Sequence, residues 1–331
     1  VPYTKQFREK LRALIASDSG RERDIKSARK SVEDELTSLH AAAVMRFMSE
    51  ENLSYTDVDL VGFHGHTIDH NPNRGCTVQI GDGPTLSRLL KLPVVHDFRS
   101  NDVRHGGQGA PLAPIFHAAL FATVEKPTAV LNIGGVANVT WIGKEWHSML
   151  SFDTGPGNAL IDDWVQLHGA GDYDESGKNA AAGSVDYAIL EMLLEDPYFI
   201  AHPPKSLDRD TFSPACVEGL TLEDGAATLA MFTVRSIGLA VKHFPVPPEQ
   251  WIVCGGGRLN RYIMDCLTRE VSCAVAGSDA IGFNGDAIEA QAFAFLAIRS
   301  ILELPISFPG TTGVAKPLTG GRVEVPADHF G

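Results

Sequence analysis

Glycine-rich turns follow three apolar runs of this sequence, and glycine lets a backbone approach an anion and aim N–H groups at it. The turns contain Gly134 and Gly135, Gly155 and Gly157, and Gly255, Gly256 and Gly257. Each turn alone could simply close a strand–helix connection. Three such turns, all at the carboxyl ends of expected strands, favour binding of nucleotide phosphates, although neither GxxxxGK[ST] nor GxGxxG occurs.

Asp153 stands directly before one of these turns, at the end of the strand-like run MLSF. A carboxylate there could act as general base on a water or a hydroxyl. The competing interpretation is a helix N-cap. The following helix is expected to begin near Asn158 or Ala159, which makes Asn158 the better cap. This leaves Asp153 as the candidate catalytic residue.

The run HDFRSNDVRHGGQGAPLAP gathers polar side chains after an expected strand. They include Asp97, Arg99, Asp102 and Gln108. An arginine between carboxylates is suited to bind a substrate carboxylate with two hydrogen bonds. The same residues could form an internal ion-pair network that holds the loop. Their spacing does not separate these two interpretations.

The run GFHGHTIDHNP holds four metal-ligating residue types, His64, His66, Asp69 and His70. Strand geometry would place His64 and His66 on one face without fixing a third ligand. A loop lining a substrate is therefore favoured over a metal site.

The run HPPKSLDRDTF places two cations, Lys205 and Arg209, in a proline-led loop. The loop could close over a substrate or a phosphate, and it could equally be a solvated surface turn.

Short β-rich runs alternate with helical stretches, which indicates α/β layers. Strands are expected in 58–65, 93–98, 128–135 and 251–257, and helices in the first 50 residues and in 184–194, 225–244 and 286–302. The segment 308–326 is rich in Gly, Pro and Thr and is expected to be loop. Two lobes with a cleft between them follow, a first of residues 1–126 and a second, nucleotide-binding, of residues 127–302. The C-terminal segment 303–331 is expected to return to the first lobe.

The composition limits the classes of partner. The 331 residues include 28 Lys and Arg against 41 Asp and Glu, a net charge of −13. Such a chain repels a phosphate backbone, so no nucleic acid is expected as a partner. No apolar stretch reaches the roughly 20 residues that span a bilayer. The five cysteines form no CxxC pair, which favours a reducing compartment over a disulfide framework.

Taken together, the runs HGHTIDHNP, TVQIGDG, DFRSNDVRHGGQGAPLAP, LNIGGVANVT, FDTGPGNALIDDW, PPKSLDRDTF, VCGGGRLN and GDAIEAQAFAFLA resemble, in order, those of the anhydro-N-acetylmuramic acid kinase family. The resemblance implies the sugar kinase, Hsp70 and actin superfamily, with two ribonuclease-H-like lobes and ATP in the cleft. It also implies a bacterial cytoplasmic enzyme of peptidoglycan recycling in the cell wall, present as a homodimer.

The implied reaction opens the 1,6-anhydro ring and phosphorylates O6, giving N-acetylmuramic acid 6-phosphate. Asp153, at the family's catalytic Asp position, would take a proton from the water that attacks the anomeric carbon, and Mg²⁺ would enter with ATP rather than on protein ligands. By resemblance, the nucleotide would contact Gly134, Gly135, Gly155, Gly157, Gly255, Gly256, Gly257 and Asn260. The sugar would contact His64, Gly65, Asp97, Arg99 and Gln108, with Arg99 the candidate partner of the lactyl carboxylate.

The sequence departs from the family pattern in a few places. Family members open with a strand and a phosphate loop of the type MSGTSxDG, which this sequence does not contain. The first lobe is therefore expected without its leading strands. His66 stands where Gln is usual, and Leu207-Asp208 where Thr-Gly is common. Two alternatives to the kinase stay open, a sugar- or nucleotide-binding member without turnover and a different sugar kinase in which Asp153 activates a free hydroxyl.

Overall fold

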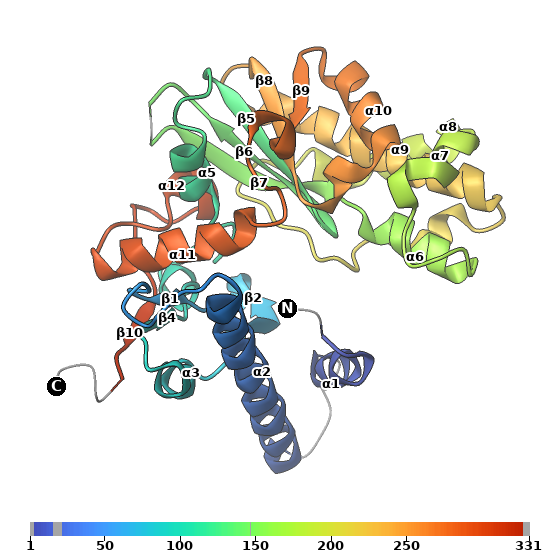
Figure 1. Ribbon diagram of the computed structural model, residues 1–331. Helices are drawn as coiled ribbons and strands as arrows, with labels where there is room; N and C mark the ends of the chain where they lie inside the picture. The colour runs from blue at the N-terminus through green and yellow to red at the C-terminus, as the bar shows by residue number, and fades with distance from the viewer. Residues whose placement is uncertain (1–2, 16–21, 146, 327–331) are drawn as a thin grey trace. The chain divides into compact units, whose positions relative to one another are not determined.

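The computed structural model describes residues 3–15, 22–145 and 147–326, and the chain divides into two compact units (Figure 1). Unit 1 comprises Val1–Leu112 and Ala290–Gly331, and unit 2 comprises Ala113–Glu289. Both boundaries come earlier in the chain than the expected ones. Helix α5 (Pro114–Leu120) belongs to unit 2 because it contacts strands of its sheet. Helix α11 (Ile288–Ile301) falls mostly in unit 1. Its Phe293 carbonyl lies so close to Gly62 that a Cβ on that residue would be 2.4 Å from the oxygen.

Unit 2 is built on a mixed five-stranded sheet in the order β7-β6-β5-β8-β9. The strands are β5 (Thr128–Ile133), β6 (Val136–Ile142), β7 (Met149–Pro156), β8 (Gln250–Cys254) and β9 (Ala274–Gly277). β5, β6 and β7 form an antiparallel meander, while β8 and β9 run parallel to β5. This arrangement is ribonuclease-H-like, and the predicted α/β class is confirmed.

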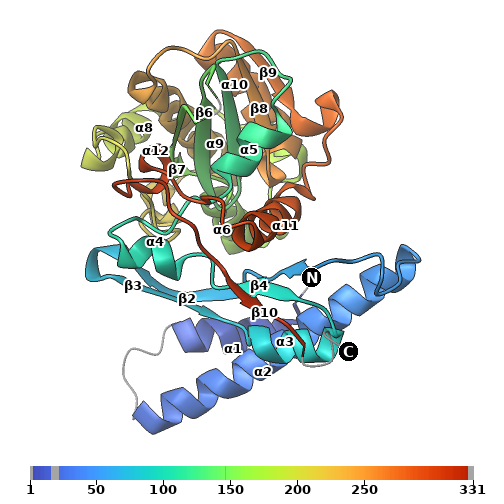
Figure 2. The same ribbon diagram turned by 90° about the vertical axis from the view of Figure 1, so that its left-hand side faces the viewer.

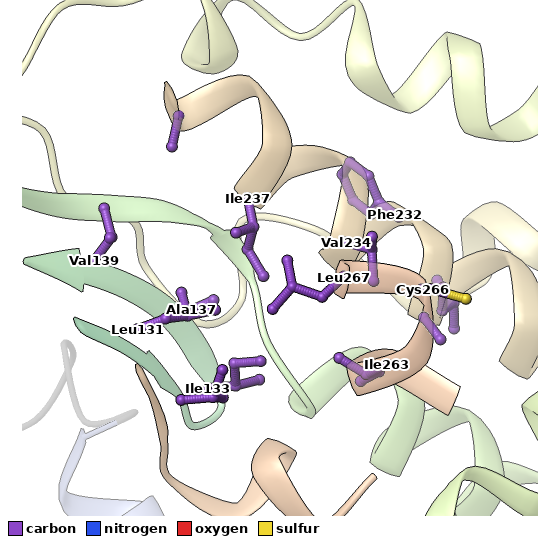
Figure 3. Packing of buried hydrophobic residues seen from close by; sticks show 14 of the residues in the cluster. Leu131, Ile133, Ala137, Val139, Phe232, Val234, Ile237, Ile263, Cys266 and Leu267 are labelled. Atoms are coloured by element: carbon purple, nitrogen blue, oxygen red, sulfur yellow. The ribbon is translucent and has the colours of Figure 1, made fainter. Parts of the chain in front are cut away.

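The core of unit 2 lies between this sheet and two long helices. Figure 3 shows Leu131 and Val139 of the sheet with Ile237 of α9 (Leu222–Ala240) and Leu267 of α10 (Arg261–Val271). The remaining helices of the unit are α6 (Ala159–Leu167), α7 (Lys178–Ala182) and α8 (Tyr187–Leu194). The helices expected in 184–194, 225–244 and 286–302 are all present. α9 starts slightly earlier than expected because the Thr221 side chain caps it.

Unit 1 contains a three-stranded sheet and a separate hairpin (Figure 2). The sheet joins β1 (Val61–Gly62), β4 (Val94–His96) and β10 (Arg322–Glu324), and the hairpin joins β2 (His66–Asn71) and β3 (Cys76–Ile80). Helices α1 (Lys5–Ile15), α2 (Glu22–Glu50) and α3 (Gly83–Leu90) pack against these strands, and α4 (Ser100–Arg104) and α12 (Pro309–Thr312) complete the unit. Among the described residues, this sheet has fewer strands than that of unit 2.

The expectation that 308–326 is all loop was wrong. Its last part forms β10, which pairs antiparallel with β4 and places Val323 beside Val95. The backbone hydrogen bonds of β4 outweigh the loop-like local composition, which only a long-range pairing could show. No helix in the described ranges has the length and apolar character needed to cross a bilayer.

Candidate active site

The three glycine turns come together at one end of the unit 2 sheet. The Asn158 N–H donates to the Gly134 carbonyl at 2.7 Å, and the Gly157 N–H donates to that of Gly135 at 2.9 Å. A methyl group on Gly257 would lie 2.3 Å from the Ile133 side chain. The seven glycines that the sequence analysis named in these turns therefore form one backbone assembly, the glycine cluster.

The glycines of the cluster fall into two kinds. A Cβ on Gly155, Gly157, Gly255 or Gly257 would approach a neighbouring atom within 2.6 Å, so packing alone requires glycine there. A Cβ on Gly256 would meet nothing closer than 3.6 Å. The same clearance holds for Gly134 and Gly135. Among the described residues, the N–H groups of Gly135 and Gly256 have no hydrogen-bond partner, which leaves them available to an anion.

Two asparagines border the cluster. Asn158 occupies the N-cap position of α6 as expected, but its side chain does not cap the helix; its Nδ2 donates instead to the Ile133 carbonyl at 3.1 Å. Asn260 caps α10, because its Oδ1 accepts the Ile263 N–H at 3.1 Å, and it is buried. The Asn260 side-chain oxygen is thus used by the helix cap. The contact of Asn260 with a nucleotide stays a prediction.

The sequence predicts that Asp153 ends its strand, and the structure shows that it does not. β7 continues to Pro156, with an irregular register against β6 next to Asp153. β7 is an edge strand, and its free side is bonded by the segment 198–207. The Asp153 N–H donates to the Lys205 carbonyl at 3.2 Å, and the Leu207 N–H donates to Asp153 Oδ2 at 2.8 Å. The Tyr198 hydroxyl donates to the Asp153 carbonyl at 2.5 Å, so the segment holds both the backbone and the carboxylate.

The environment of Asp153 suits a general base. Burial raises the pKa of its carboxyl to about 6, and the hydrogen bond from Leu207 works in the opposite direction. At neutral pH the group is therefore mostly ionised, while its proton affinity exceeds that of an ordinary aspartate. A base whose pKa lies near the working pH transfers protons efficiently.

The same burial predicts a stability effect. We expect Asp153→Asn to raise the free energy of unfolding at pH 7.5 by about 1–3 kcal/mol, since each pKa unit corresponds to about 1.4 kcal/mol. The folded-state pKa of about 6 lies above the ordinary value of 3.8, so the cost of ionisation is present above pH 6 and disappears as the pH falls toward 3.8. Urea unfolding of both proteins at pH 7.5 and pH 4 measures this difference. An equal difference at both pH values would contradict it.

Lys205 and Arg209 both anchor the segment that holds Asp153. The Lys205 ammonium lies over the Tyr198 ring, 4.5 Å from its centroid, and donates to the Tyr198 carbonyl at 2.9 Å. Burial lowers the pKa of Lys205 to about 8. Arg209 pairs with Asp163 at 2.8 Å and with Asp210 at 3.0 Å. These contacts give both cations a structural role.

In unit 1, a pocket of about 280 Å³ brings together three of the predicted sugar-side residues, His64, Gly65 and Asp97. Arg99 is bonded to one of them: its Nε donates to His64 Nε2 at 2.9 Å, and its Nη1 donates to the Gly109 carbonyl at 2.6 Å. Gln108 does not line the pocket, and its backbone N–H donates to the Thr312 carbonyl. The pocket is the candidate sugar site.

His64 is neutral in this pocket. Burial, and then the neighbouring Arg99 charge, lower the pKa of His64 to about 3. Its Nε2 accepts from Arg99, so the proton resides on Nδ1, which lies 3.1 Å from the Gly65 carbonyl oxygen. Arg99 thereby fixes the ring orientation of His64.

The carboxylates that flank Arg99 in the sequence bond to other groups. Asp97 pairs with Arg322 at 3.0 Å, and its φ of 54° lies in the left-handed region that few residues other than glycine adopt. Asp102 is buried and accepts hydrogen bonds from the Gly109 N–H and from the Thr312 hydroxyl, each at 2.6 Å. Asp102 therefore ties the loop to the C-terminal segment of the chain.

His66, Asp69 and His70 lie on the β2–β3 hairpin. His70 Nδ1 is 3.0 Å from the Thr77 hydroxyl, and the Cys76 thiol donates to Asp69. Within the described part of the chain, no three His, Cys, Asp or Glu side chains are grouped to hold a metal ion.

Sequence reasoning missed several residues of the unit 1 pocket. Four are residues of β3 and one directly follows that strand: Thr77, Val78, Gln79, Ile80 and Gly81. Three flank the predicted residues, namely Phe63, His96 and Ser100, and the last is the cation Arg29 of α2. Nothing in the local sequence distinguishes Arg29 from the other charged residues of α2, because only the packing of α2 against β3 brings it to the pocket.

Comparison with known proteins identifies the family. The model of the family "Anhydro-N-acetylmuramic acid kinase" matches residues 1–325. A relative of that name from Rhizorhabdus wittichii is 48% identical over 98% of this chain and 89% of its own length. One from Methylobacterium nodulans is 52% identical over 90% of this chain and 80% of its own length. A third, in Rhodospirillum rubrum, is 48% identical over 100% of this chain and 87% of its own.

One solved structure that the fold comparison finds is far more distant. A ROK family glucokinase from Streptomyces griseus in complex with glucose and AMPPNP aligns at a TM-score of 0.38 and 13% identity, over 78% of this chain and 87% of that one. That similarity is too low to support an inference. The family match along nearly the whole length and the identities near one half are conclusive, and the chain belongs to the anhydro-N-acetylmuramic acid kinase family.

Proposed function

We propose that this kinase uses Asp153 as general base when it opens the 1,6-anhydro ring of anhydro-N-acetylmuramic acid and phosphorylates O6. The observation that carries the proposal is the placement of Asp153. Its carboxylate is oriented by the Leu207 N–H, and burial raises its pKa to about 6. It also adjoins the turn of Gly155 and Gly157 in the glycine cluster.

In the proposed reaction, water opens the anhydro ring and O6 then takes the phosphoryl group. Asp153 takes a proton from a water molecule whose oxygen forms a bond to C1 of the sugar. The C1–O6 bond breaks, and its electron pair stays on O6. O6 then forms a bond to the γ-phosphorus of ATP as the bond to ADP breaks. The products are N-acetylmuramic acid 6-phosphate and ADP, and Asp153 later releases its proton to solvent. Phosphoryl capture of O6 replaces the second carboxylate that glycosidic cleavage often uses.

The glycine cluster is the proposed phosphate site. The unpaired N–H groups of Gly135 and Gly256 would donate to phosphate oxygens, which removes the need for a basic side chain there. Mg²⁺ would be bound by the triphosphate oxygens, which are the ligands it prefers, and would neutralise charge on them. We assign it no protein ligand.

The sugar is proposed to bind in the unit 1 pocket, against His64, Gly65 and Asp97. Arg99 would hold His64 in place, and its predicted contact with the lactyl carboxylate stays a prediction, as does any contact of Gln108. The reaction requires the sugar to meet Asp153 of unit 2.

The family resemblance also supports three broader proposals. The protein would act in the bacterial cytoplasm, it would serve peptidoglycan recycling, and it would be a homodimer. Light scattering on the purified protein would measure twice the 35.6 kDa chain mass for a dimer.

The activity is tested by incubating the protein with ATP, Mg²⁺ and either anhydro-N-acetylmuramic acid or the opened sugar, N-acetylmuramic acid. We expect ADP only with the anhydro sugar, together with one new reducing end for each ADP. Equal rates with the opened sugar would support a kinase in which Asp153 activates a free hydroxyl. Binding of both substrates without ADP release would support a member without turnover.

The pH dependence follows from the pKa of Asp153. We expect kcat/KM for the anhydro sugar to be level above pH 7 and to fall about tenfold per pH unit below pH 6, because the free enzyme then carries a protonated Asp153. Initial rates between pH 4.5 and pH 9 measure this profile. A level profile down to pH 5 would contradict the role of a base with this pKa.

A further inference from the structure

The unit 1 pocket contains a cation that lies outside every loop singled out in the sequence. Arg29 of α2 lines the same 280 Å³ pocket as His64, Gly65 and Asp97. It is partly buried, and α2 is held at this position by contacts with β3.

The charge of Arg29 is not neutralised within the protein. Among the described residues, its guanidinium forms no hydrogen bond and no ion pair. The neighbouring Lys30 differs, since its ammonium pairs with Asp34 at 2.9 Å and with Asp82 at 3.2 Å. Of the α2 cations whose side chains the structure describes, the one available to a ligand in the pocket is therefore Arg29.

The other titratable groups of the pocket are already engaged. Asp97 pairs with Arg322, His96 Nε2 lies 3.3 Å from a Glu324 oxygen, and burial keeps His64 neutral. Among the side chains that the structure describes, an anionic group entering the pocket thus meets the uncompensated positive charge of Arg29. A guanidinium offers two parallel N–H donors that match a carboxylate, and a pocket wall that includes the buried Phe63 strengthens such a pair.

We propose that Arg29 binds the lactyl carboxylate of the sugar and so determines the preference for muramic acid over glucosamine. The inference rests on the proposed function, because it takes the unit 1 pocket as the sugar site. Anhydro-N-acetylglucosamine has the same anhydro ring and N-acetyl group but no lactyl group. It therefore serves as the probe that isolates the carboxylate. This proposal replaces the lactyl contact that the family resemblance implies for Arg99, which would act on both sugars through the orientation of His64.

The test is calorimetric titration of wild type, Arg29→Gln and Arg29→Lys with both anhydro sugars. For Arg29→Gln we expect the Kd of anhydro-N-acetylmuramic acid to rise at least about tenfold and that of anhydro-N-acetylglucosamine to change less than about twofold, as a charge-assisted bidentate contact is lost for one sugar only. Arg29→Lys keeps the charge and should recover part of the loss. Arg46→Gln is the matched control, because Arg46 is an exposed arginine of the same helix whose partner is Glu50.

The outcomes separate this proposal from the proposed function. Equal weakening of both sugars, or no weakening of either, would overturn the role of Arg29. Arg99→Gln should weaken both sugars alike, and selective loss of the muramic sugar there would assign the carboxylate to Arg99 instead. A wild type that discriminates between the sugars by binding but releases no ADP would refute the proposed turnover while leaving the Arg29 proposal intact.

Discussion

Asp153→Asn will lower the turnover of anhydro-N-acetylmuramic acid by about 10²–10⁴-fold, the usual contribution of a positioned general base. The amide keeps the size of the carboxylate, and its oxygen still accepts the Leu207 N–H. It cannot take a proton from water. The Kd values of sugar and ATP should therefore change little, and the loss should appear in kcat.

Asp172→Asn is the matched control for this variant, since Asp172 is an exposed aspartate of the same unit. Its turnover should equal that of wild type. The measurement is steady-state ADP release at saturating sugar, with binding followed separately by calorimetry. Turnover within about tenfold of wild type in Asp153→Asn would fall short of the contribution of a general base and would remove Asp153 from that role.

Gly256→Ala will weaken ATP binding by at least about tenfold with little change in thermal stability. The new methyl group meets no protein atom closer than 3.6 Å, so the fold accommodates it. It would stand where a phosphate oxygen must approach the backbone N–H. Gly157→Ala behaves differently, because its methyl group would lie 2.3 Å from the Gly134 carbonyl oxygen. Overpacking of this kind costs about 1–3 kcal/mol of stability.

Gly277→Ala provides the control for both glycine variants. It lies at the end of β9 in the same unit, and a Cβ there meets nothing within 4 Å. Both its stability and its affinity for ATP should match wild type. ATP binding by Gly256→Ala at wild-type affinity would show that the glycine cluster closes turns without holding phosphates.

Local patterns in the sequence were enough to predict β5 and β8 of unit 2 and the long helix α9. β5 and β8 are apolar runs ended by glycine, and α9 follows the helical period along its apolar face. The type of such an element is determined by residues that are close together in the chain. It can therefore be inferred without knowing which strand or helix packs against it.

The rest depends on contacts between segments far apart in sequence. β10 forms because β4 offers hydrogen bonds, although its own segment reads as loop. β7 continues past Asp153 because β6 pairs with it, and Tyr198 reaches Asp153 from a separate loop. Likewise, the carboxylates beside Arg99 suggested local ion pairs, whereas Asp97 pairs with Arg322 near the C-terminus. No spacing rule within one segment reports such pairings.

The most direct test of the proposed chemistry is to run the reaction in H₂¹⁸O. The product is reduced with borohydride immediately after quenching, which fixes the oxygen on C1, and its fragments are weighed by mass spectrometry. N-Acetylmuramic acid 6-phosphate incubated in the same water for the same time measures exchange. Attack by water at C1, with O6 then taking the phosphoryl group, predicts one ¹⁸O atom on C1 and none on O6 or the phosphate. An unlabelled C1, or ¹⁸O in the phosphate ester, would contradict it.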